Sequence, residues 1–324
     1  LSHRIGWKVR GRRLSPSYLS HHILPRASIT PPPSKSQAHR LIIAAALAEG
    51  ESHLSNVALS QDIIATLNCM RALGAQAAKD GSLICGLGGR KQRFDHLPQL
   101  DCGESGSTLR FLIPVALAVA GGGVFSGHGR LMERPQGPYE TLFAEKNIHF
   151  SRENGVLRVE GRLTSGTYEL PGDVSSQFIT GLMYALPMLE GDSEIRLTTP
   201  LESSGYVDMT IDALSSFGVR IKPIEGGWHI PGGQCGRARD AAVESDYSQA
   251  GFYFAARLLG SDVEILGLNP NSAQGDAVIV PYAEQLARSG TVTLDVSQCP
   301  DLVPPLAVMA ALRRGETTHI VGAA

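Results

Sequence analysis

Two kinds of hydrophobic pattern alternate along the chain and predict two kinds of helix. In the first kind, apolar residues at helical spacing lead into a turn and then a strand, as in IIATLNCMRALGAQAA, YETLFAEKNIHF, TIDALSSFGVRIK and YAEQLARSGTVTL. The turn residues are Gly74, Asn147, Gly218 and Gly290, at intervals of 73, 71 and 72 residues. Glycine and asparagine favour the left-handed conformation in which many helices end. The pattern therefore predicts a repeated helix–turn–strand unit.

The second kind of helix is apolar on nearly every side and follows a serine-bearing loop. Its copies begin PSKSQAHRLIIAAALAEG, GESGSTLRFLIPVALAVAGG, DVSSQFITGLMYALPMLEG and ESDYSQAGFYFAARLLG, with serines at positions 36, 105, 175 and 245. A fifth helix, DLVPPLAVMAALRRG, follows at a shorter interval. Helices that are apolar all round belong inside a layer. We therefore predict lobes of α/β type, with buried helices covered by strands and by the amphipathic helices.

The length of the repeat predicts how many repeats the chain contains. Each repeat is about 70 residues long, and four of them fill residues 30 to about 300. The sequence then stops inside a fifth repeat, so we expect one of the two lobes to be incomplete.

Residues 1–26 contain no acidic residue and many arginines, serines and histidines. A transit peptide has such a composition, but an upstream extension or a disordered tail is the favoured interpretation.

Composition and charge exclude several classes of protein. Of the 324 residues, 43% are hydrophobic and 19% are charged, which is typical of a globular protein with a sizeable core. The formal net charge of −2 gives no support to a nucleic-acid partner. The five cysteines form no CxxC pair and HExxH is absent, so we expect reduced thiols and no metal site. The longest apolar run, FLIPVALAVAGGGVF, is too short and too interrupted to span a bilayer.

Cations beside the serine-bearing loops predict an anion site. Helix N-termini attract anions through exposed N–H groups and the helix dipole, although serine there is more often only a cap. A cation opposes that dipole, so its presence needs a reason. Lys35 and Arg40 flank the first loop, Arg110 follows the second, and Arg134 stands in LMERPQGP. They predict a ligand with several anionic groups, or two anionic ligands.

Two further observations narrow the chemistry. Neither the phosphate-binding loop GxxxxGK[ST] nor GxGxxG with a following acid is present, so nucleotide and dinucleotide folds are not expected. Asp301, in CPDLVPPLAVMAAL, starts an apolar helix. Its carboxylate suits a helix cap and a catalytic base about equally well.

Six motifs, in this order and with these spacings, carry a family resemblance: PSKSQAHR, GESGSTLRFL, LMERPQGP, GDVSSQF, SSGYVDMT and CPDLVPPLAVMAA. Together they closely resemble the 5-enolpyruvylshikimate-3-phosphate synthase family, from about Ile29 to the last residue. The related UDP-N-acetylglucosamine enolpyruvyl transferases share that fold but have asparagine after the lysine. They also use a loop cysteine near the arginine matched by Arg134, and no cysteine lies between Cys102 and Cys235 here.

The resemblance implies a two-lobed enolpyruvyl transferase fold, an inside-out α/β barrel built from βαβαββ units. Residues 33–240 would form the first lobe with three units, and residues 27–32 and 241–324 an incomplete second lobe, with residues 1–26 as an extension. The sequence stops before the family's Lys-Glu-Ser/Thr-Asp-Arg segment, so the resemblance implies a chain that is truncated at its C-terminus.

The implied reaction transfers the enolpyruvyl group of phosphoenolpyruvate to the 5-hydroxyl of shikimate 3-phosphate and releases phosphate. This is the sixth step of the shikimate pathway, toward chorismate and the aromatic amino acids. It requires no metal or organic cofactor and implies a cytoplasmic monomer with small-molecule partners and no nucleic-acid or membrane partner. One alternative is a catalytically incompetent chain that only binds shikimate 3-phosphate. A less favoured one is a UDP-N-acetylglucosamine enolpyruvyl transferase.

The resemblance also implies the site residues. Lys35 would contact both substrates, and Asp301 would be the base that takes the proton of the 5-hydroxyl. The residues implied on the shikimate 3-phosphate side are Ser36, Arg40, Ser175, Ser176, Ser203 and Tyr206, of which Ser175 and Ser176 bind the 3-phosphate. The remaining positions are Gly106 and Arg134, which face phosphoenolpyruvate, and Gln177, which reaches both ligands.

Glu104 departs from the family pattern, because many members have asparagine there. A carboxylate beside an anion pocket is unfavourable unless it turns away or pairs with a cation. Two residues further on, Gly106 in place of a bulkier residue predicts room for the inhibitor glyphosate.

Overall fold

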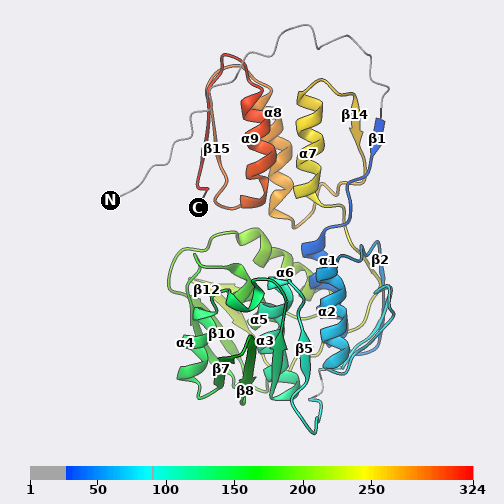
Figure 1. The fold of residues 1–324 in the computed structure, drawn as a ribbon, viewed down its shortest axis with the longest axis vertical. Helices are drawn as coiled ribbons and strands as arrows, with labels where there is room; N and C mark the ends of the chain where they lie inside the picture. Colours follow the sequence, from blue (N-terminus) through cyan, green and yellow to red (C-terminus); the bar gives the residue numbers. More distant parts are fainter. Residues whose placement is uncertain (1–26, 90, 324) are drawn as a thin grey trace. The chain divides into compact units, whose positions relative to one another are not determined.

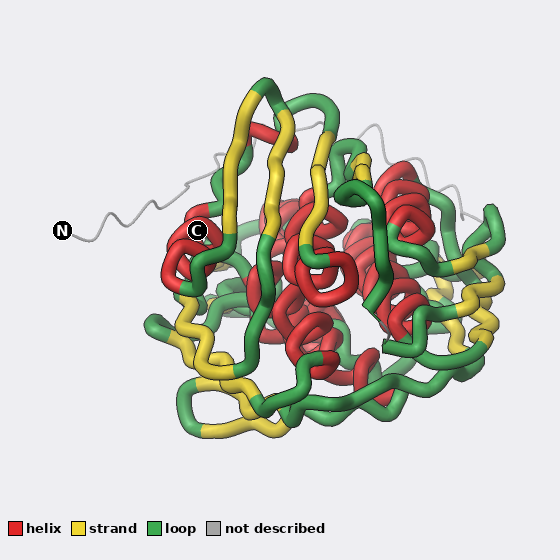
Figure 2. The backbone as a smooth tube through the Cα atoms, turned by 90° about the horizontal axis from the view of Figure 1, so that it is seen from below, coloured by secondary structure: helices red, strands yellow, loops and turns green. Residues whose placement is uncertain are grey.

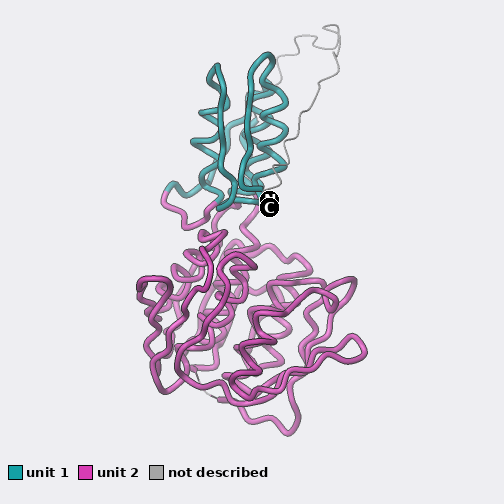
Figure 3. Tube along the Cα trace, turned by 90° about the vertical axis from the view of Figure 1, so that its left-hand side faces the viewer, with its two compact units in different colours: residues 1–31, 247–270, 276–324 teal, residues 32–246, 271–275 magenta. Residues whose placement is uncertain are grey.

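The computed structural model describes residues 27–89 and 91–323, which form two compact units (Figures 1 and 3). The larger unit comprises residues 32–246 and 271–275. The smaller unit comprises the described parts of residues 1–31, 247–270 and 276–324. Each unit has its own hydrophobic core, so each is described by itself.

The larger unit contains both predicted kinds of helix. The apolar helices that follow serine-bearing loops are α1 (Lys35–Leu47), α3 (Gly106–Ala120) and α5 (Ser176–Ala185). The amphipathic helices are α2 (Gln61–Ala72), α4 (Gly137–Glu145) and α6 (Ser204–Ser216). Short 3-10 helices occur at η2 (Leu131–Glu133) and η3 (Leu186–Met188). The helix pattern of the sequence is confirmed in this unit.

The core of the larger unit lies between these helices. Helix α3 packs against α5, while α1 packs against α2 and α6. Figure 2 shows the helices nearly end-on, with strands and loops around them. Ile42 and Ile43 of α1, Leu112 of α3 and Ile179 of α5 are fully buried. The side chains of these helices are buried on almost every side, which is why their sequences have no polar face.

Three four-stranded sheets surround the helices and repeat one topology. Their spatial orders are β5-β6-β8-β7, β9-β10-β12-β11 and β13-β2-β4-β3. In each, the first two strands are parallel and the remaining pairs are antiparallel. The strands are β2 (Glu51–Ser55), β3 (Gln76–Ala77), β4 (Leu83–Cys85), β5 (Gln99–Asp101), β6 (Gly122–Ser126), β7 (His149–Glu153), β8 (Val156–Glu160), β9 (Gly166–Leu170), β10 (Ser193–Leu197), β11 (Lys222–Ile224), β12 (Gly227–Ile230) and β13 (Ala241–Ala242).

The order of elements gives the βαβαββ unit that the resemblance implies. The second copy runs β5-α3-β6-α4-β7-β8 and the third runs β9-α5-β10-α6-β11-β12. The first copy takes its first strand, β13, from the other end of the larger unit, where Ala241 pairs with Leu54 of β2. The first and last segments of the larger unit therefore complete one sheet between them.

The smaller unit follows the same plan with fewer strands. Strand β1 (Ala27–Ile29) pairs in parallel with β14 (Val263–Ile265), and β15 (Val292–Asp295) pairs in parallel with β16 (Thr318–Val321). Its helices are α7 (Tyr247–Leu258), η4 (Gly275–Val278), α8 (Ile279–Leu286), η5 (Pro300–Leu302) and α9 (Val303–Ala311). Leu294, Leu306 and Met309 are fully buried at its centre.

The repeated turn has one backbone geometry in all four copies. The φ angles of Gly74, Asn147, Gly218 and Gly290 are 104°, 55°, 83° and 97°. These values lie in the left-handed region that glycine and asparagine tolerate best. Gly74, Asn147 and Gly218 directly follow the C-caps of α2, α4 and α6, so these three predicted helix ends are confirmed. Helix α8 ends earlier, with its C-cap at Ala287, three residues before Gly290.

Candidate active site

The site is built where three buried helices of the larger unit begin. A serine caps each of them: Ser34 accepts a hydrogen bond from the backbone of Gln37, and Ser105 and Ser175 do the same for Thr108 and Gln177. A capping serine satisfies one N–H group of the helix end, and the others remain available to an anion. The serines therefore serve as caps, and the helix ends keep donors for a ligand.

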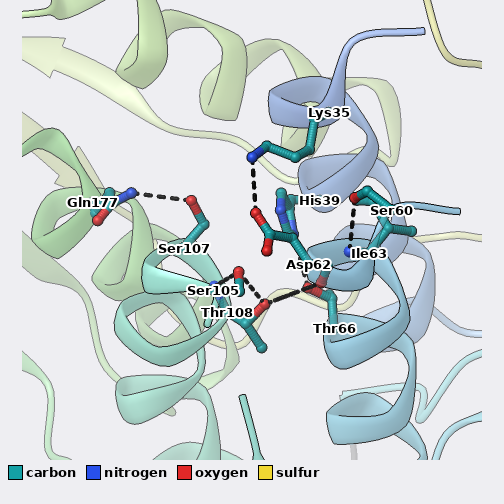
Figure 4. Close-up of polar contacts among 10 residues, drawn as sticks. All are labelled: Lys35, His39, Ser60, Asp62, Ile63, Thr66, Ser105, Ser107, Thr108 and Gln177. Carbon is teal, nitrogen blue, oxygen red and sulfur yellow. Dashed lines mark hydrogen bonds and ion pairs between the residues drawn. The ribbon is translucent and has the colours of Figure 1, made fainter. Parts of the chain in front are cut away.

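Lys35 forms an ion pair at the start of α1 (Figure 4). Its Nζ lies 2.8 Å from Oδ2 of Asp62, which stands in the first turn of α2. The side chain of Lys35 is 54% exposed and that of Asp62 is 27% exposed. Asp62 is absent from the residues that the sequence predicts for the site. The signal that could have pointed to it is weak, since an acid in the first turn after a serine cap is common in helices.

A buried chain of polar groups lies beneath this ion pair. Nδ1 of His39 is 2.8 Å from Oγ1 of Thr66, which is 2.7 Å from Oγ1 of Thr108, and Thr108 donates to Oγ of Ser105 (Figure 4). These residues come from α1, α2, α3 and the cap of α3. Burial lowers the pKa of His39 to about 3, so its imidazole is neutral. Nε2 of His39 has no hydrogen-bond partner among the described residues.

Arg40 is 3% exposed and donates its hydrogen bonds to the protein. Nη1 donates to the backbone oxygen of Ser36 at 2.7 Å, and Nη2 donates to that of Tyr206 at 2.8 Å. Nε donates to Thr210 Oγ1 at 2.9 Å. The guanidinium also lies over the rings of Phe111 and Tyr206, and burial lowers the pKa of Arg40. Arg40 therefore brings Ser36 and Tyr206 together by joining α1 to α6.

Arg110 joins the starts of α3 and α5. Its Nη1 donates to Oε1 of Gln177 at 2.9 Å and lies 3.5 Å from Oγ of Ser175, and its Nη2 donates to the backbone oxygen of Pro135. Nε2 of Gln177 in turn donates to Oγ of Ser107 at 3.0 Å (Figure 4). Burial lowers the pKa of Arg110, and the nearby Arg134 lowers it further. Gln177 and Ser175 are thus held beside one another, as the predicted site requires.

Arg134 lies against the start of α3 where Gly106 leaves room. A methyl group at Gly106 would be 2.7 Å from Nη1 of Arg134, which is shorter than a normal contact. Arg134 is exposed, and its guanidinium makes no hydrogen bond within the described part of the chain. Arg134 and Arg110 therefore form a local concentration of positive charge beside the N-terminus of α3.

The remaining predicted residues lie at helix starts. Ser176 is buried at the first position of α5, and Ser203 precedes α6 with a left-handed φ of 55°. Glu104 is exposed, and its Oε1 lies 2.8 Å from where a methyl group on Gly129 would stand. Asp301 belongs to the smaller unit, where it is exposed in η5. The geometry therefore joins Arg40 with Ser36 and Tyr206. It also brings Gly106 and Arg134 close to Gln177, whereas Asp301 lies in the smaller unit.

The described residues meet the requirements of neither a metal-binding cluster nor a membrane-spanning helix. Within residues 27–89 and 91–323, no group of three or more histidines, cysteines, aspartates or glutamates could hold a metal ion. None of the helices in that part of the chain is long and apolar enough to cross a bilayer.

Two solved structures have a fold similar to that of this chain. Two structures of EPSP synthase from Acinetobacter baumannii match with TM-scores of 0.73 and 0.74, at 23% and 24% identity. Each match covers 90% of this chain and 73% of the other. The predicted two-lobed enolpyruvyl transferase fold is confirmed by this likeness.

The sequence comparisons identify the family. The family model described as EPSP synthase (3-phosphoshikimate 1-carboxyvinyltransferase) matches residues 25–324. A 3-phosphoshikimate 1-carboxyvinyltransferase of Clostridium perfringens strain SM101 is 43% identical over 317 residues, and one of Clostridium acetobutylicum is 44% identical over 318 residues. Both alignments cover 92% of this chain and 74% of the relative. The chain therefore belongs to the EPSP synthase family.

Proposed function

We propose that this chain transfers the enolpyruvyl group of phosphoenolpyruvate to the 5-hydroxyl of shikimate 3-phosphate and releases phosphate. The observation that carries the proposal is the match of residues 25–324 to the family of 3-phosphoshikimate 1-carboxyvinyltransferases. The site agrees chemically, since both substrates are anions. Capped helix starts with cations beside them suit two such ligands better than any neutral one.

The start of α5 takes the 3-phosphate of shikimate 3-phosphate. The hydroxyls of Ser175 and Ser176 and the free backbone N–H groups of the first turn donate to its oxygens. Ser36, Ser203 and Tyr206 line the side of the shikimate ring. Arg40 supports this side through the protein, because its guanidinium holds the backbone oxygens of Ser36 and Tyr206 at 2.7 and 2.8 Å.

Phosphoenolpyruvate lies at the start of α3. Arg134 pairs with an anionic group of phosphoenolpyruvate, and Gly106 leaves the space in which the two meet. Gln177, already fixed by Arg110 and Ser107, contacts both ligands. Lys35 contacts both substrates as well, because an ammonium group has three N–H donors that point in different directions.

The reaction needs the two anions to be held together and a proton to be moved. The 5-hydroxyl oxygen adds to the enol carbon of phosphoenolpyruvate, its proton goes to Asp301, and the neighbouring carbon takes a proton. Loss of phosphate and of a proton then restores the double bond in the product. The protein residues act by orienting the substrates and by neutralising their crowded negative charges.

The larger unit corresponds in this proposal to the first lobe, predicted at residues 33–240, and the smaller unit to the second, predicted at residues 27–32 and 241–324. The protein works as a monomer in the cytoplasm, with small molecules as partners and without nucleic acid. The alternatives differ in what they predict for turnover. A chain that only binds shikimate 3-phosphate releases no phosphate, and a UDP-N-acetylglucosamine enolpyruvyl transferase releases it with the UDP-sugar as acceptor.

A phosphate-release assay tests the proposal. The purified chain is given phosphoenolpyruvate with shikimate 3-phosphate, with UDP-N-acetylglucosamine, or with no acceptor. Phosphate release that requires shikimate 3-phosphate is the expected result. Release with the UDP-sugar alone, or binding of shikimate 3-phosphate without any release, would overturn the proposal.

A further inference from the structure

The proposed function leaves one side chain of the site without a role, the carboxylate of Asp62. It lies 2.8 Å from the ammonium group of Lys35. A carboxylate beside a site for two anions is unfavourable unless something compensates for the repulsion. Its presence therefore calls for a function that a neutral residue could not supply.

Asp62 is held firmly in place by its helix. Ser60 caps α2 through the backbone N–H of Ile63 (Figure 4), and the carboxylate lies near the positive end of the helix dipole. The hydroxyls of Thr66 and Thr108 lie 3.2 and 3.4 Å from the backbone oxygen of Asp62. These contacts tie the first turn of α2 to the start of α3.

The same contacts reach α1. Oγ1 of Thr66 is bonded to Nδ1 of the buried His39, one turn after Lys35 along α1. The helices that carry Lys35 and Asp62 are therefore fixed to each other at a point directly below the ion pair (Figure 4). These buried hydrogen bonds fix the backbone of Asp62 relative to that of Lys35, and the carboxylate itself meets Lys35.

Lys35 is the flexible member of the pair. Its side chain has four methylene groups and is 54% exposed, so without a partner it samples many rotamers. A hydrogen bond to a fixed carboxylate restricts the ammonium group and uses one of its three N–H donors. The other two remain for the two anionic ligands.

We infer that Asp62 is a positioning residue, which holds the ammonium of Lys35 where both substrates meet it. The inference rests on the proposed function of Lys35. An ion pair with this exposure contributes little to folding stability, so stability alone does not account for it. Removal of the carboxylate has two effects on ligand binding that oppose each other. The anions lose a repulsive neighbour, and Lys35 loses its orientation.

Because the two effects oppose each other, we expect Asp62→Asn to change kcat much more than KM. In Asp62→Asn the KM values for both substrates stay within about threefold, because the two effects offset each other in the ground state. The kcat value falls by about 10- to 100-fold, because the developing charge meets a misplaced cation. Asp62→Glu keeps the carboxylate and restores most of the rate. Glu194→Gln, which breaks a surface ion pair of 2.7 Å with Arg196, leaves kcat unchanged.

A second measurement separates this inference from the proposed function. The mobility of the Lys35 side chain in the unliganded chain is measured by NMR on ¹³C-labelled lysine, with Lys35→Ala to assign the signal. Asp62→Asn should increase the mobility of Lys35, while Glu194→Gln should not. Circular dichroism shows whether each variant is folded, and Asp62→Ala, which also removes the carboxylate, serves as the test if Asp62→Asn is not.

The outcomes distinguish the two ideas. An unmodified chain without turnover contradicts the proposed function, and the mobility of Lys35 then still decides the role of Asp62. Unchanged kcat in Asp62→Asn, or a higher KM with unchanged kcat, overturns the positioning role. Unchanged mobility of Lys35 in a folded Asp62→Asn overturns it as well.

Discussion

At the scale of single residues, His39 shows how the packing of the site determines a protonation state. Its ring is 1% exposed, one nitrogen is bonded to Thr66, and burial lowers its pKa to about 3. The positive charges of Arg40 and Lys35 also oppose protonation, whereas Asp62 acts in the opposite direction and does not prevail. A charged imidazole at this position would have no water to solvate it.

This burial predicts a pH dependence of stability. The unfolded chain protonates His39 near pH 6.5, but the folded protein does so only near pH 3, so folding releases a proton between these values. Stability therefore falls as the pH drops below about 6.5, by about 2 kcal/mol between pH 7 and pH 5 for this group. His39→Asn keeps a polar atom near Thr66 but cannot titrate. Urea unfolding at pH 7 and pH 5 measures the free energy of unfolding of both proteins. The unmodified protein should lose more of it than His39→Asn on going to pH 5, and equal losses would contradict the account.

Gly106 gives a second prediction at this scale. A methyl group there would stand 2.7 Å from Nη1 of Arg134, so Gly106→Ala displaces the guanidinium. We expect KM for phosphoenolpyruvate to rise about tenfold, since the proposed pairing of Arg134 with the anion is weakened. Stability should change by less than about 1 kcal/mol, because alanine fits a helical backbone. Gly137→Ala is the matched control, as nothing lies within 4 Å of its added methyl group. Equal KM values for both variants would refute this role of Gly106.

At the scale of elements, Arg40 connects two helices that are far apart in sequence. Tyr206 and Thr210 of α6 accept its hydrogen bonds from 166 and 170 residues away. Lysine cannot reach these acceptors at once, because it lacks the planar fork of donors. We expect Arg40→Lys to lower the free energy of unfolding by about 2 to 3 kcal/mol. Arg196→Lys on the surface of β10 should cost less than about 0.5 kcal/mol. Denaturant curves for both variants check this, and similar losses would argue against it.

The start of α5 carries the prediction for the 3-phosphate. Ser175→Ala removes the cap hydroxyl, which accepts from the backbone of Gln177 and lies near Arg110. The affinity for shikimate 3-phosphate should fall about tenfold or more, because a hydrogen bond to a charged group is lost. Ser216→Ala removes a hydroxyl from the far end of α6, where it donates to Ala213, and should leave the affinity unchanged. Calorimetric titration measures both. Unchanged affinity in Ser175→Ala would place the phosphate elsewhere.

At the scale of the whole molecule, the repeat was predictable because it rests on local signals. Gly74, Asn147 and Gly218 mark helix ends through their backbone preference, and serines mark the starts, so the period of about 70 residues is visible in the sequence. The pairing of β13 with β2 was not predictable, because Ala241 and Ala242 carry no pattern of their own. Their place depends on where the other end of the larger unit leaves an open strand edge.

For the same reason, the sequence predicts which candidate site residues stand at helix starts. Lys35, Ser175 and Gln177 stand at helix starts, where sequence motifs are recognisable. Asp62 reaches Lys35 from another helix, 27 residues away, and an acid in a first helical turn is too common to reveal such a contact. The sequence also offered no sign that Arg40 is enclosed by protein, because its acceptors lie in α6. Contacts between helices that are distant in sequence can be identified only once the fold is known.

The most direct test of the central claim is a ³¹P NMR measurement of the chain with phosphoenolpyruvate and shikimate 3-phosphate. We predict that the phosphoenolpyruvate signal is converted to inorganic phosphate in equal amount to the product formed. Lys35→Ala should slow this conversion by at least about 100-fold, since it removes the cation that both substrates share. Persistence of both substrate signals with the unmodified chain, or equal rates with and without Lys35, would contradict the account.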